Sequence, residues 1–516
     1  MRLWRDALTT SADLFAADFA TLPDLVRAHA QERPQAIAVA DPDTRINWRD
    51  FDALVDRIAA RLQSDGIGRG SATALAGLNS VAQVAAFIAT LRAGAVAGLI
   101  TSTATGEQMA AMIMDSGATH LFLDEKAAES LAGQSFGAPH LISLDESTAG
   151  TPLSSWMAAE GSAPFPVQIE PTDAFNIIYS SGTTGTPKGI VHSHAMRWQH
   201  INRALAAYGP DAVSLLSTPL YSNTTMASFL PTLGGGGTVV MMRKFDALGF
   251  LELAERERVT NTMLVPVQYR RIMAHPEFGR FDLSSFRMKY CTSAPFAAVL
   301  KADVVARWPG GLVEIYGMTE GGGVCLLMAH EFPDKLHTVG RPSPGHDMRV
   351  IDEEGIELPT GSVGEIVGRS PAMMSGYNNR QDATDAMKWW DADGNLFYRH
   401  GDIGRFDEDG FLTLMDRAKD MIISGGFNIY PSDLEAILLQ DDAVIEAAVI
   451  GALSDDWGET PVGFVVVKAG ADLDAILATA NAKVGRTQRL NRLIAINELP
   501  RSPIGKVLKR ELRDGL

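Results

Sequence analysis

The spacing of apolar residues along the first third of the chain predicts alternating helices and strands. Apolar side chains recur every three or four positions through residues 47–65, as an amphipathic helix requires. Residues 72–78 and 95–100 are short apolar runs of the kind found in buried strands, and residues 81–92 between them fit a helix. A strand, a helix and a second strand in this order predict neighbouring parallel strands, and therefore an α/β fold.

The pattern changes twice further along the chain. Short apolar runs followed by helical stretches continue through residues 213–316. From about residue 348 the runs are separated by Asp-Gly turns, as at residues 391–394 and 407–410, which predicts hairpins and a β-rich subdomain. A small terminal region begins near residue 417, where Ser432 and Glu435 have the spacing of a capping box that opens a helix.

Length and charge limit the classes of function. The chain has 516 residues, too many for one hydrophobic core, so at least two domains are expected. Its net charge of −17 disfavours nonspecific binding to nucleic acid or to an anionic membrane, but it is compatible with an anionic ligand in a local basic pocket. The two cysteines, Cys291 and Cys325, show no Cys/His ligand spacing, which argues against a disulfide framework and a structural zinc site.

No segment has the pattern of a membrane span. The most apolar long run, residues 84–100, contains Arg92 and glycines, and it fits a helix, a turn and a strand better. The N-terminus has no apolar core of the signal-peptide type. We therefore expect a cytoplasmic protein, and the sequence leaves open whether it forms a homodimer.

Residues 179–189 carry the strongest chemical signal. They read Tyr-Ser-Ser-Gly-Thr-Thr-Gly-Thr-Pro-Lys-Gly and follow an apolar run of the strand type. Glycines let a backbone approach a ligand, hydroxyls donate hydrogen bonds and Lys188 adds a positive charge, so this stretch is predicted to cradle phosphate groups. It is not a Walker A loop, because Gly189 rather than Ser or Thr follows the lysine, and a flexible linker would seldom follow a buried strand. The candidate phosphate ligands are Ser180, Ser181, Gly182, Thr183, Thr184 and Lys188.

A second stretch combines an aromatic ring, a hydroxyl and a carboxylate. Tyr316, Gly317, Thr319 and Glu320 end a predicted strand, and such a set suits stacking a base, contacting a phosphate and holding Mg²⁺. Asp402 follows another glycine and is placed to accept hydrogen bonds from ribose hydroxyls, although an ordinary turn aspartate would have the same pattern.

Two later stretches carry charge beside glycine. The charged residues around Arg417 and Lys419 precede Ser424, Gly425 and Gly426, which fits a hinge next to a close backbone approach, or else a plain charged linker. Near the end, Lys506 follows a Pro-x-Gly turn, which is unusual for a solvated basic tail.

Together these stretches resemble one family. From about Phe175 to the C-terminus, their order and spacing are similar to those of the adenylate-forming superfamily of acyl-CoA synthetases, luciferases and nonribosomal-peptide adenylation domains. The first third of the chain is similar to the family only in its length and in its βαβ pattern. The matching stretches are residues 179–189, 316–320, 364–377, 398–402, 416–431 and 500–506.

The resemblance implies both an architecture and a reaction. It implies a large N-terminal AMP- and acyl-binding domain of stacked mixed α/β sheets over residues 1–416, with a β-rich subdomain. A hinge at residues 417–420 and a small mobile α+β domain at residues 421–516 would follow. A small carboxylic acid and ATP would give an acyl-adenylate and pyrophosphate, with Mg²⁺ present. A thiol, usually coenzyme A, would then take the acyl group and release AMP.

Two other functions stay open. One is an adenylating enzyme that loads a carrier-protein thiol in place of coenzyme A. The other is a nucleotide-binding protein without catalysis, against which the presence of Glu320 and Lys506 argues.

Residue roles follow from the resemblance alone. Lys506 would bridge the carboxylate and the α-phosphate, while Thr319 and Glu320 would hold the α-phosphate and Mg²⁺. The remaining nucleotide contacts would be Thr183, Thr184 and Lys188 on the β- and γ-phosphates, Tyr316 beside adenine, and Asp402 with Arg417 on the ribose. In the mobile domain, Lys419 would be the hinge residue, and the coenzyme A tunnel would be lined by Ser424, Gly425 and Gly426.

The acyl pocket would be formed by two stretches, Tyr221, Ser222 and Met226 in one and Thr292, Ser293 and Ala294 in the other. The first stretch lacks the Asp with which amino-acid-activating domains hold an ammonium group, which argues against an amino acid. Many acyl- and aryl-CoA ligases have His at Ser222 and a Gly pair at Thr292 and Ser293. Side chains in place of glycines predict a narrow pocket for a short, medium or aromatic acid, unless these are neutral packing changes.

Overall fold

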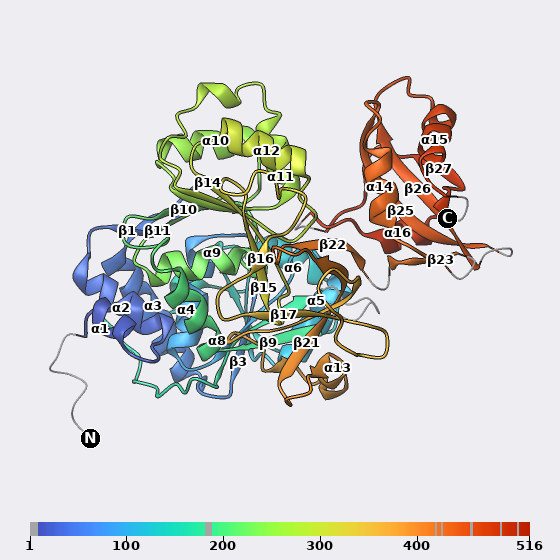
Figure 1. Ribbon diagram of the computed structural model, residues 1–516. Coiled ribbons are helices and arrows are strands. Elements are labelled where there is room, and N and C mark those ends of the chain that lie inside the picture. Colours follow the sequence, from blue (N-terminus) through green and yellow to red (C-terminus); the bar gives the residue numbers. More distant parts are fainter. Residues whose placement is uncertain are drawn as a thin grey trace.

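Across the described residues, the protein consists of four β-sheets and the helices around them. The computed structural model describes residues 9–180, 188–417, 420–424, 427–454, 458–485, 488–502 and 505–516. Figure 1 shows a large body that holds three of the sheets, with a smaller C-terminal domain, coloured orange to red, beside it. The predicted α/β fold, with a large N-terminal and a small C-terminal domain, is confirmed.

An eight-stranded sheet contains the predicted strand–helix–strand unit. That unit is β3 (Ala72–Ala76), α4 (Val81–Arg92) and β4 (Val96–Leu99), with β3 and β4 parallel as expected. The strand order is β19-β9-β8-β4-β3-β5-β6-β7. The other strands are β5 (His120–Leu123), β6 (His140–Ser143), β7 (Thr151–Pro152), β8 (Ala174–Ser180), β9 (Lys188–Ser193) and β19 (Gly376–Tyr377). The other helices of this part are α1 (Ser11–Ala16), α2 (Leu22–Glu32), α3 (Trp48–Ser64), α5 (Gly106–Ser116), α6 (Glu125–Leu131) and α7 (Leu153–Trp156).

A nine-stranded sheet follows, in the order β16-β15-β14-β13-β12-β10-β11-β1-β2. Its central strands are parallel: β10 (Val213–Leu216), β11 (Thr238–Met241), β12 (Asn261–Leu264), β13 (Met288–Cys291) and β14 (Gly311–Gly317). The outer strands are β1 (Ile37–Ala40), β2 (Arg45–Asn47), β15 (Val324–Met328) and β16 (Arg341–Pro342), with β2 and β16 at the two edges. The helices are α8 (His194–Ala204), α9 (Asn223–Gly234), α10 (Ala247–Arg256), α11 (Pro266–Met273) and α12 (Ala298–Arg307), with a 3-10 turn at Phe278–Arg280.

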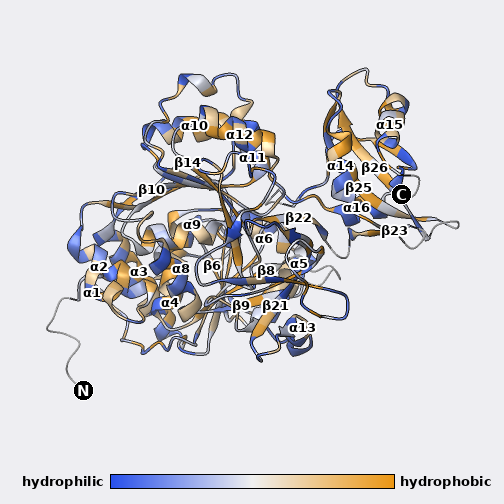
Figure 2. Ribbon diagram, in the orientation of Figure 1, coloured by the Kyte–Doolittle hydropathy of each residue, from blue (hydrophilic) through white to orange (hydrophobic). Residues whose placement is uncertain are grey.

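The two large sheets share one hydrophobic core. Phe87 of α4 lies 5.7 Å from Phe175 of β8 and 6.0 Å from Phe229 of α9, measured between ring centroids. The helix that covers one sheet therefore packs against the helix that covers the other. Burying a phenylalanine stabilises a fold by about 1.5–3 kcal/mol, so these rings contribute strongly to joining the layers. Figure 2 shows the apolar residues concentrated on the strands inside the body.

The β-rich subdomain is a five-stranded antiparallel sheet. Its strands are β17 (Asp347–Ile351), β18 (Gly364–Arg369), β20 (Lys388–Trp390), β21 (Leu396–Phe406) and β22 (Leu412–Arg417), with α13 (Gln381–Ala386) beside them. The Asp-Gly turns at residues 391–394 and 407–410 join β20 to β21 and β21 to β22. The predicted hairpins are confirmed.

The C-terminal domain has a sheet and a core of its own. Its strands are β23 (Ile422–Ser424), β24 (Phe427–Ile429), β25 (Val444–Ser454), β26 (Gly458–Val467) and β27 (Arg492–Ala495). Its helices are α14 (Pro431–Leu438), α15 (Leu473–Ala482) and α16 (Lys509–Asp514). Ile422, Leu438 and Val465 are fully buried between them.

The predicted capping box at the start of α14 is wrong. The N-cap is Tyr430, and no side chain caps the helix. Ser432 instead donates its hydroxyl to the carbonyl of Met415 and its N–H to Asp416 Oδ2 at 3.0 Å. Glu435 accepts the N–H of Val449 at 2.8 Å. Both polar side chains therefore make tertiary contacts, which the local spacing could not reveal.

Both cysteines are fully buried, Cys291 at the end of β13 and Cys325 in β15. Burial raises the pKa of each thiol above its usual range. Within the described ranges, no helix has the length and apolar character needed to cross a bilayer.

Candidate active site

Three of the predicted site stretches follow parallel strands of the nine-stranded sheet. Strands β10, β12, β13 and β14 are neighbours and parallel, so their carboxyl ends lie along the same edge. Ser222 follows β10, Thr292 follows β13 and Thr319 follows β14. Loops at the carboxyl ends of parallel strands form the usual ligand crevice of α/β folds.

Glu320 and Lys188 approach one tyrosine that was not among the predicted site residues. Tyr377 of β19 donates its hydroxyl to Glu320 Oε1 at 2.7 Å, and Lys188 Nζ lies 5.2 Å from the centre of its ring. Burial, and then the Glu320 carboxylate, raise the pKa of Tyr377, so the phenol stays neutral and keeps its proton. Because β19 pairs with β9, Tyr377 lies beside the strand that follows the phosphate stretch.

Tyr316 and Asp402 are also brought together. The Tyr316 hydroxyl donates to Asp402 Oδ2 at 2.8 Å, and its oxygen lies 3.1 Å from His400 Nδ1. The Tyr316 side chain is buried, so its hydrogen bond holds the Asp402 carboxylate in a fixed position. Asp402 pairs with Arg417 in the β21–β22 ladder, which makes these two predicted ribose ligands direct cross-strand partners.

A buried network that the sequence did not reveal supports Thr319. Arg197 of α8 donates to His192 Nδ1 at 2.8 Å, and His192 Nε2 lies 2.8 Å from the Thr319 carbonyl. A guanidinium only donates and a carbonyl only accepts, so His192 is neutral and carries its proton on Nε2. Burial, and then the Arg197 charge, hold its pKa well below the usual range.

The same arginine reaches the wall of the predicted acyl pocket. Arg197 donates to Asn176 Oδ1 and to Asn223 Oδ1, both at 2.9 Å, and Asn223 is the first residue of α9. Arg197 is fully buried, and burial lowers its pKa to about 9. Periodicity could not reveal Arg197, because a single charged side chain on a helix leaves no periodic signal. The histidines next to it in the sequence were the only indication of a polar cluster.

The two predicted acyl-pocket stretches are in contact. Thr224, in the first turn of α9, has its hydroxyl 2.6 Å from that of Ser293. Ser293 has a φ of 81°, a left-handed conformation that favours glycine and strains other residues. Thr292 Oγ1 donates to the carbonyl of Ile315 at 2.7 Å, which ties this stretch to β14. The hydroxyl pair joins the loop after β13 to the start of α9.

The remaining acyl-pocket candidates differ in what their side chains contact. Ser222 is the N-cap of α9 and accepts the N–H of Thr224 at 3.2 Å. Tyr221 has its hydroxyl 2.9 Å from Thr103 Oγ1, in the turn between β4 and α5, and burial raises the pKa of Tyr221 to about 12. Met226 is fully buried in the shared core, and Ala294 is half-buried.

The Lys506 loop lies against the large domain. A side chain built at Gly505 would meet Val267 at 3.0 Å and Val265 at 3.5 Å, so the backbone of this loop contacts the start of α11. Val265 follows β12, which places the loop at the same sheet edge as Ser222 and Thr292. Gly505 has a φ of 78°, so the turn itself requires glycine.

Several predicted residues lie outside the described part of the chain. These are Ser181, Gly182, Thr183, Thr184, Lys419, Gly425 and Gly426, together with the side chains of Ser180 and Arg417. The strands on either side of the phosphate stretch are described, and they pair antiparallel with Tyr179 opposite Gly189. Ser424, at the end of β23, is buried. Gly317, at the end of β14, is exposed.

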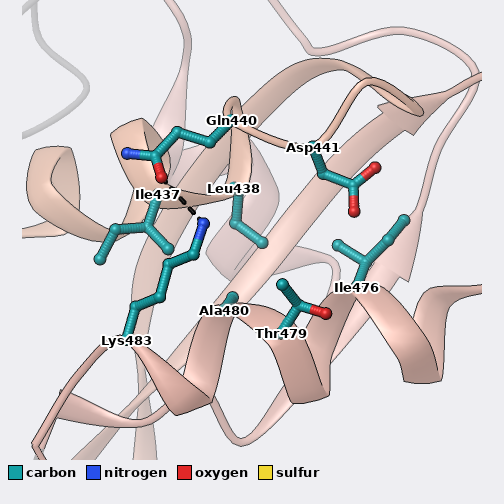
Figure 3. Close-up of a pocket in the computed structure, with 8 residues that line it drawn as sticks. All are labelled: Ile437, Leu438, Gln440, Asp441, Ile476, Thr479, Ala480 and Lys483. Carbon is teal, nitrogen blue, oxygen red and sulfur yellow. Dashed lines mark hydrogen bonds between the residues drawn. The ribbon is translucent and has the colours of Figure 1, made fainter.

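A separate small cavity of about 80 Å³ lies in the C-terminal domain, between α14 and α15. Figure 3 shows apolar side chains such as Leu438 and Ile476 around it, with Lys483 donating to Gln440 at 2.9 Å on one side. None of its lining residues belongs to the stretches with candidate chemistry.

Comparison with known proteins agrees with this arrangement. A family profile described as "AMP-binding enzyme" matches residues 26–378, and one described as "AMP-binding enzyme C-terminal domain" matches residues 433–506. The chain is 32% identical over 514 residues to an indoleacetate–CoA ligase from Aromatoleum aromaticum, covering 95% of this chain and 97% of the relative. It is 33% identical over 519 residues to 4-coumarate–CoA ligase 5 of Oryza sativa, covering 97% and 95%. A fatty acid–[acyl-carrier-protein] ligase, ScoC of Streptomyces coeruleorubidus, is 31% identical over 512 residues, covering 96% of both chains.

Solved structures share the fold over nearly the whole length. ATP-bound MatB from Rhodopseudomonas palustris has a TM-score of 0.86 and 27% identity, covering 96% of this chain and 99% of that one. The amide bond synthetase McbA from Marinactinospora thermotolerans has a TM-score of 0.84 and 29% identity, covering 96% and 99%. Because family profiles match both its N-terminal and its C-terminal part, the chain belongs to the AMP-binding enzymes of the adenylate-forming superfamily.

Proposed function

We propose that this protein is an AMP-forming acid–thiol ligase that joins a small, non-amino carboxylic acid to coenzyme A. In the first step the acid carboxylate attacks the α-phosphorus of ATP, giving an acyl-adenylate and pyrophosphate. In the second, the thiol of coenzyme A attacks the acyl carbon and AMP leaves. The observation that carries the proposal is that a predicted nucleotide ligand and a predicted acyl-pocket residue lie next to each other. Thr319 and Ser293 follow adjacent strands, at the same edge of the sheet.

The chemistry explains why cationic groups are needed. A carboxylate and a polyphosphate repel each other at contact distance, so positive charge must lie where they meet. Lys506 supplies that charge beside the α-phosphate, and Lys188 beside the β- and γ-phosphates. Asp402 and Arg417 hold the ribose hydroxyls, and Tyr316 positions Asp402 through its hydroxyl.

The residues present fit Mg²⁺. Glu320 offers a hard carboxylate oxygen, as Mg²⁺ prefers, and Tyr377 donates to Oε1 only. Glu320 and Thr319 are the residues that would hold the ion. When bound, Mg²⁺ neutralises phosphate charge and polarises the phosphoryl oxygens. Glu320 keeps its orientation through the neutral Tyr377 phenol.

An aromatic acid is the favoured substrate class. Two relatives are named for indoleacetate and 4-coumarate, both aromatic acids. The hydrogen-bonded hydroxyls of Thr224 and Ser293 narrow the proposed acyl pocket, which suits a flat ring better than a long flexible chain. Neither pocket stretch has an acidic residue at the positions that Ser222 and Ser293 occupy, which disfavours a substrate acid with an ammonium group.

A carrier-protein thiol is the second candidate acceptor. The relative ScoC, named as a fatty acid–[acyl-carrier-protein] ligase, matches over the same length with 31% identity. Both acceptors use the same thiol chemistry on the acyl-adenylate. The difference lies in how the pantetheine arm reaches the site, past Ser424, Gly425 and Gly426, with Lys419 as the hinge between residues 1–416 and 421–516.

A panel of carboxylic acids tests the proposal. Each acid is incubated with ATP, Mg²⁺ and coenzyme A, and pyrophosphate, AMP and acyl-CoA are measured. We expect acid-dependent pyrophosphate release, highest for aromatic acids, with acyl-CoA formed in equal amount. Pyrophosphate release without acyl-CoA would favour the carrier-protein acceptor, and an absence of AMP with every acid would overturn the proposed function.

A further inference from the structure

One ion-pair bridge crosses from the large domain to the C-terminal domain. Arg270 of α11 donates to Glu446 Oε1 of β25. Arg501 of the C-terminal domain donates to the same oxygen at 3.0 Å. Glu446 thus lies between two guanidinium groups, of which only Arg270 belongs to the large domain.

The bridge leads directly to the Lys506 loop. The second arm of the Arg501 guanidinium donates to the carbonyl of Gly505 at 2.8 Å. The Ser502 N–H donates to the carbonyl of Lys506 at 2.8 Å, and the Lys506 N–H donates to Ser502 Oγ at 3.2 Å. The position of Arg501 therefore fixes the turn that carries Lys506.

The same helix contacts this turn at a second point. Val265, the N-cap of α11, and Val267 in its first turn lie against Gly505, and Arg270 is one turn further on. An apolar contact and an ion pair on one helix define both the distance and the rotation of the loop. Glu446 is mostly buried, with 15% of its side chain exposed, so its charge is better shielded from solvent than that of a fully exposed pair.

We propose that Arg270 is a positioning residue for Lys506: through Glu446 and Arg501 it holds the lysine turn against α11 while the acid is adenylated. This inference rests on the proposed function, because it assigns Lys506 to the first half-reaction. In the proposed arrangement, Arg270 itself contacts neither ATP nor the acid. Its removal leaves the Glu446–Arg501 pair intact, so the local fold of the turn is kept and only its docking is weakened.

Separate assays of the two half-reactions test the proposal. Acid-dependent exchange of pyrophosphate into ATP reports adenylation, and conversion of supplied acyl-adenylate and coenzyme A into acyl-CoA reports the second step. We expect Arg270→Ala to lower the exchange rate at saturating ATP and acid by about three- to ten-fold, the range of one partly shielded ion pair. The second step should be unchanged.

The neighbouring Arg271 provides the matched control, because it is an exposed arginine on the same helix. Arg271→Ala should leave both half-reactions unchanged, and Arg270→Lys should restore part of the exchange rate because it keeps the charge. An equal loss in both half-reactions for Arg270→Ala, or no loss of exchange, would overturn the proposal.

A readout independent of activity separates this inference from the proposed function. Hydrogen exchange of the backbone amides in residues 501–507, measured by mass spectrometry, should be faster in Arg270→Ala than in the unmodified protein or in Arg271→Ala. If the unmodified protein shows no exchange of pyrophosphate with any acid, the proposed function fails by itself. Unchanged amide protection in Arg270→Ala would overturn the docking role, whatever the activity.

Discussion

Ser293 shows how one residue can set the shape of a pocket at the expense of backbone strain. A left-handed conformation costs a residue other than glycine about 1–2 kcal/mol. The hydrogen bond between the Ser293 and Thr224 hydroxyls offsets about 1 kcal/mol of that. The strained residue is thus held by a partner on the opposite wall, and the two side chains narrow the space together.

Replacing Ser293 by glycine should widen the specificity of the enzyme. Ser293→Gly relieves the strain and removes one side of the hydroxyl pair, so bulkier acids should gain relative to small ones by about ten-fold in kcat/KM, the effect of roughly one methylene-sized change. Pyrophosphate release across a homologous series of acids measures this. Ser293→Ala keeps the Cβ and the strain, and it should change the ratio much less; equal shifts for both variants would contradict the steric explanation.

At the scale of single elements, β9 and α8 carry three histidines, two of them buried and the third, His200, half-buried. His192, His194 and His200 lie on these elements, and burial is the main cause of a lowered pKa in each. The pKa of His194 falls to about 4 and that of His200 to about 3. Arg197 adds to the effect on His192 and His200, because a neighbouring positive charge disfavours the protonated ring.

These histidines should make the fold less stable in mild acid. Above about pH 6.5 both the folded and the unfolded states are neutral at these rings, so the effect is absent. Between about pH 6.5 and 4 the unfolded chain binds protons that the folded His194 does not, so each such histidine lowers the free energy of unfolding by about 1.4 kcal/mol per pH unit. His194→Gln should reduce this slope in denaturant titrations at several pH values. His337→Gln, at an exposed histidine, should leave the slope unchanged.

Periodicity was sufficient to predict the elements but not all of their contacts. The βαβ unit from Ala72 to Leu99 and the hairpins after residue 348 were predictable, because burial patterns and Asp-Gly turns are local signals. The capping box at Ser432 failed because a residue of β22, distant in sequence, competes for the same hydroxyl. Tyr377 and Arg197 were missed for the same reason: what makes them part of the site is their partners, Glu320 and His192, which come from other elements.

On the scale of the whole molecule, the proposed first half-reaction would need residues from both domains. The large domain contributes Glu320 and Thr319 at the sheet edge, and the C-terminal domain contributes Lys506 on a turn that contacts α11. The two domains also touch through Ser432 and the end of β22, next to the predicted hinge. If Lys506 acts as proposed, carrying it on the small domain would allow its charge to be present in one step and absent from the other.

Lys506→Ala should therefore separate the two half-reactions. Loss of one electrostatic contact to the reacting centre slows a reaction by about 10²–10³-fold, and we expect that loss in acid-dependent pyrophosphate exchange. Formation of acyl-CoA from supplied acyl-adenylate should continue at close to the original rate. The exposed Lys468 of the same domain provides a control, since Lys468→Ala should affect neither step. Equal damage to both steps would show that Lys506 acts in a different way.

The burial of both cysteines has a consequence for an enzyme that handles an activated acyl group. An acyl-adenylate reacts with any thiolate that reaches it, and the thiolate is the reactive form of cysteine. Cys291 lies at the end of β13, directly before the predicted acyl pocket, yet its side chain is fully buried and its raised pKa keeps the thiol protonated. Cys325 is equally buried. Neither cysteine is therefore a ready acceptor for the intermediate, and acylation of a cysteine of the chain is disfavoured before an external thiol arrives.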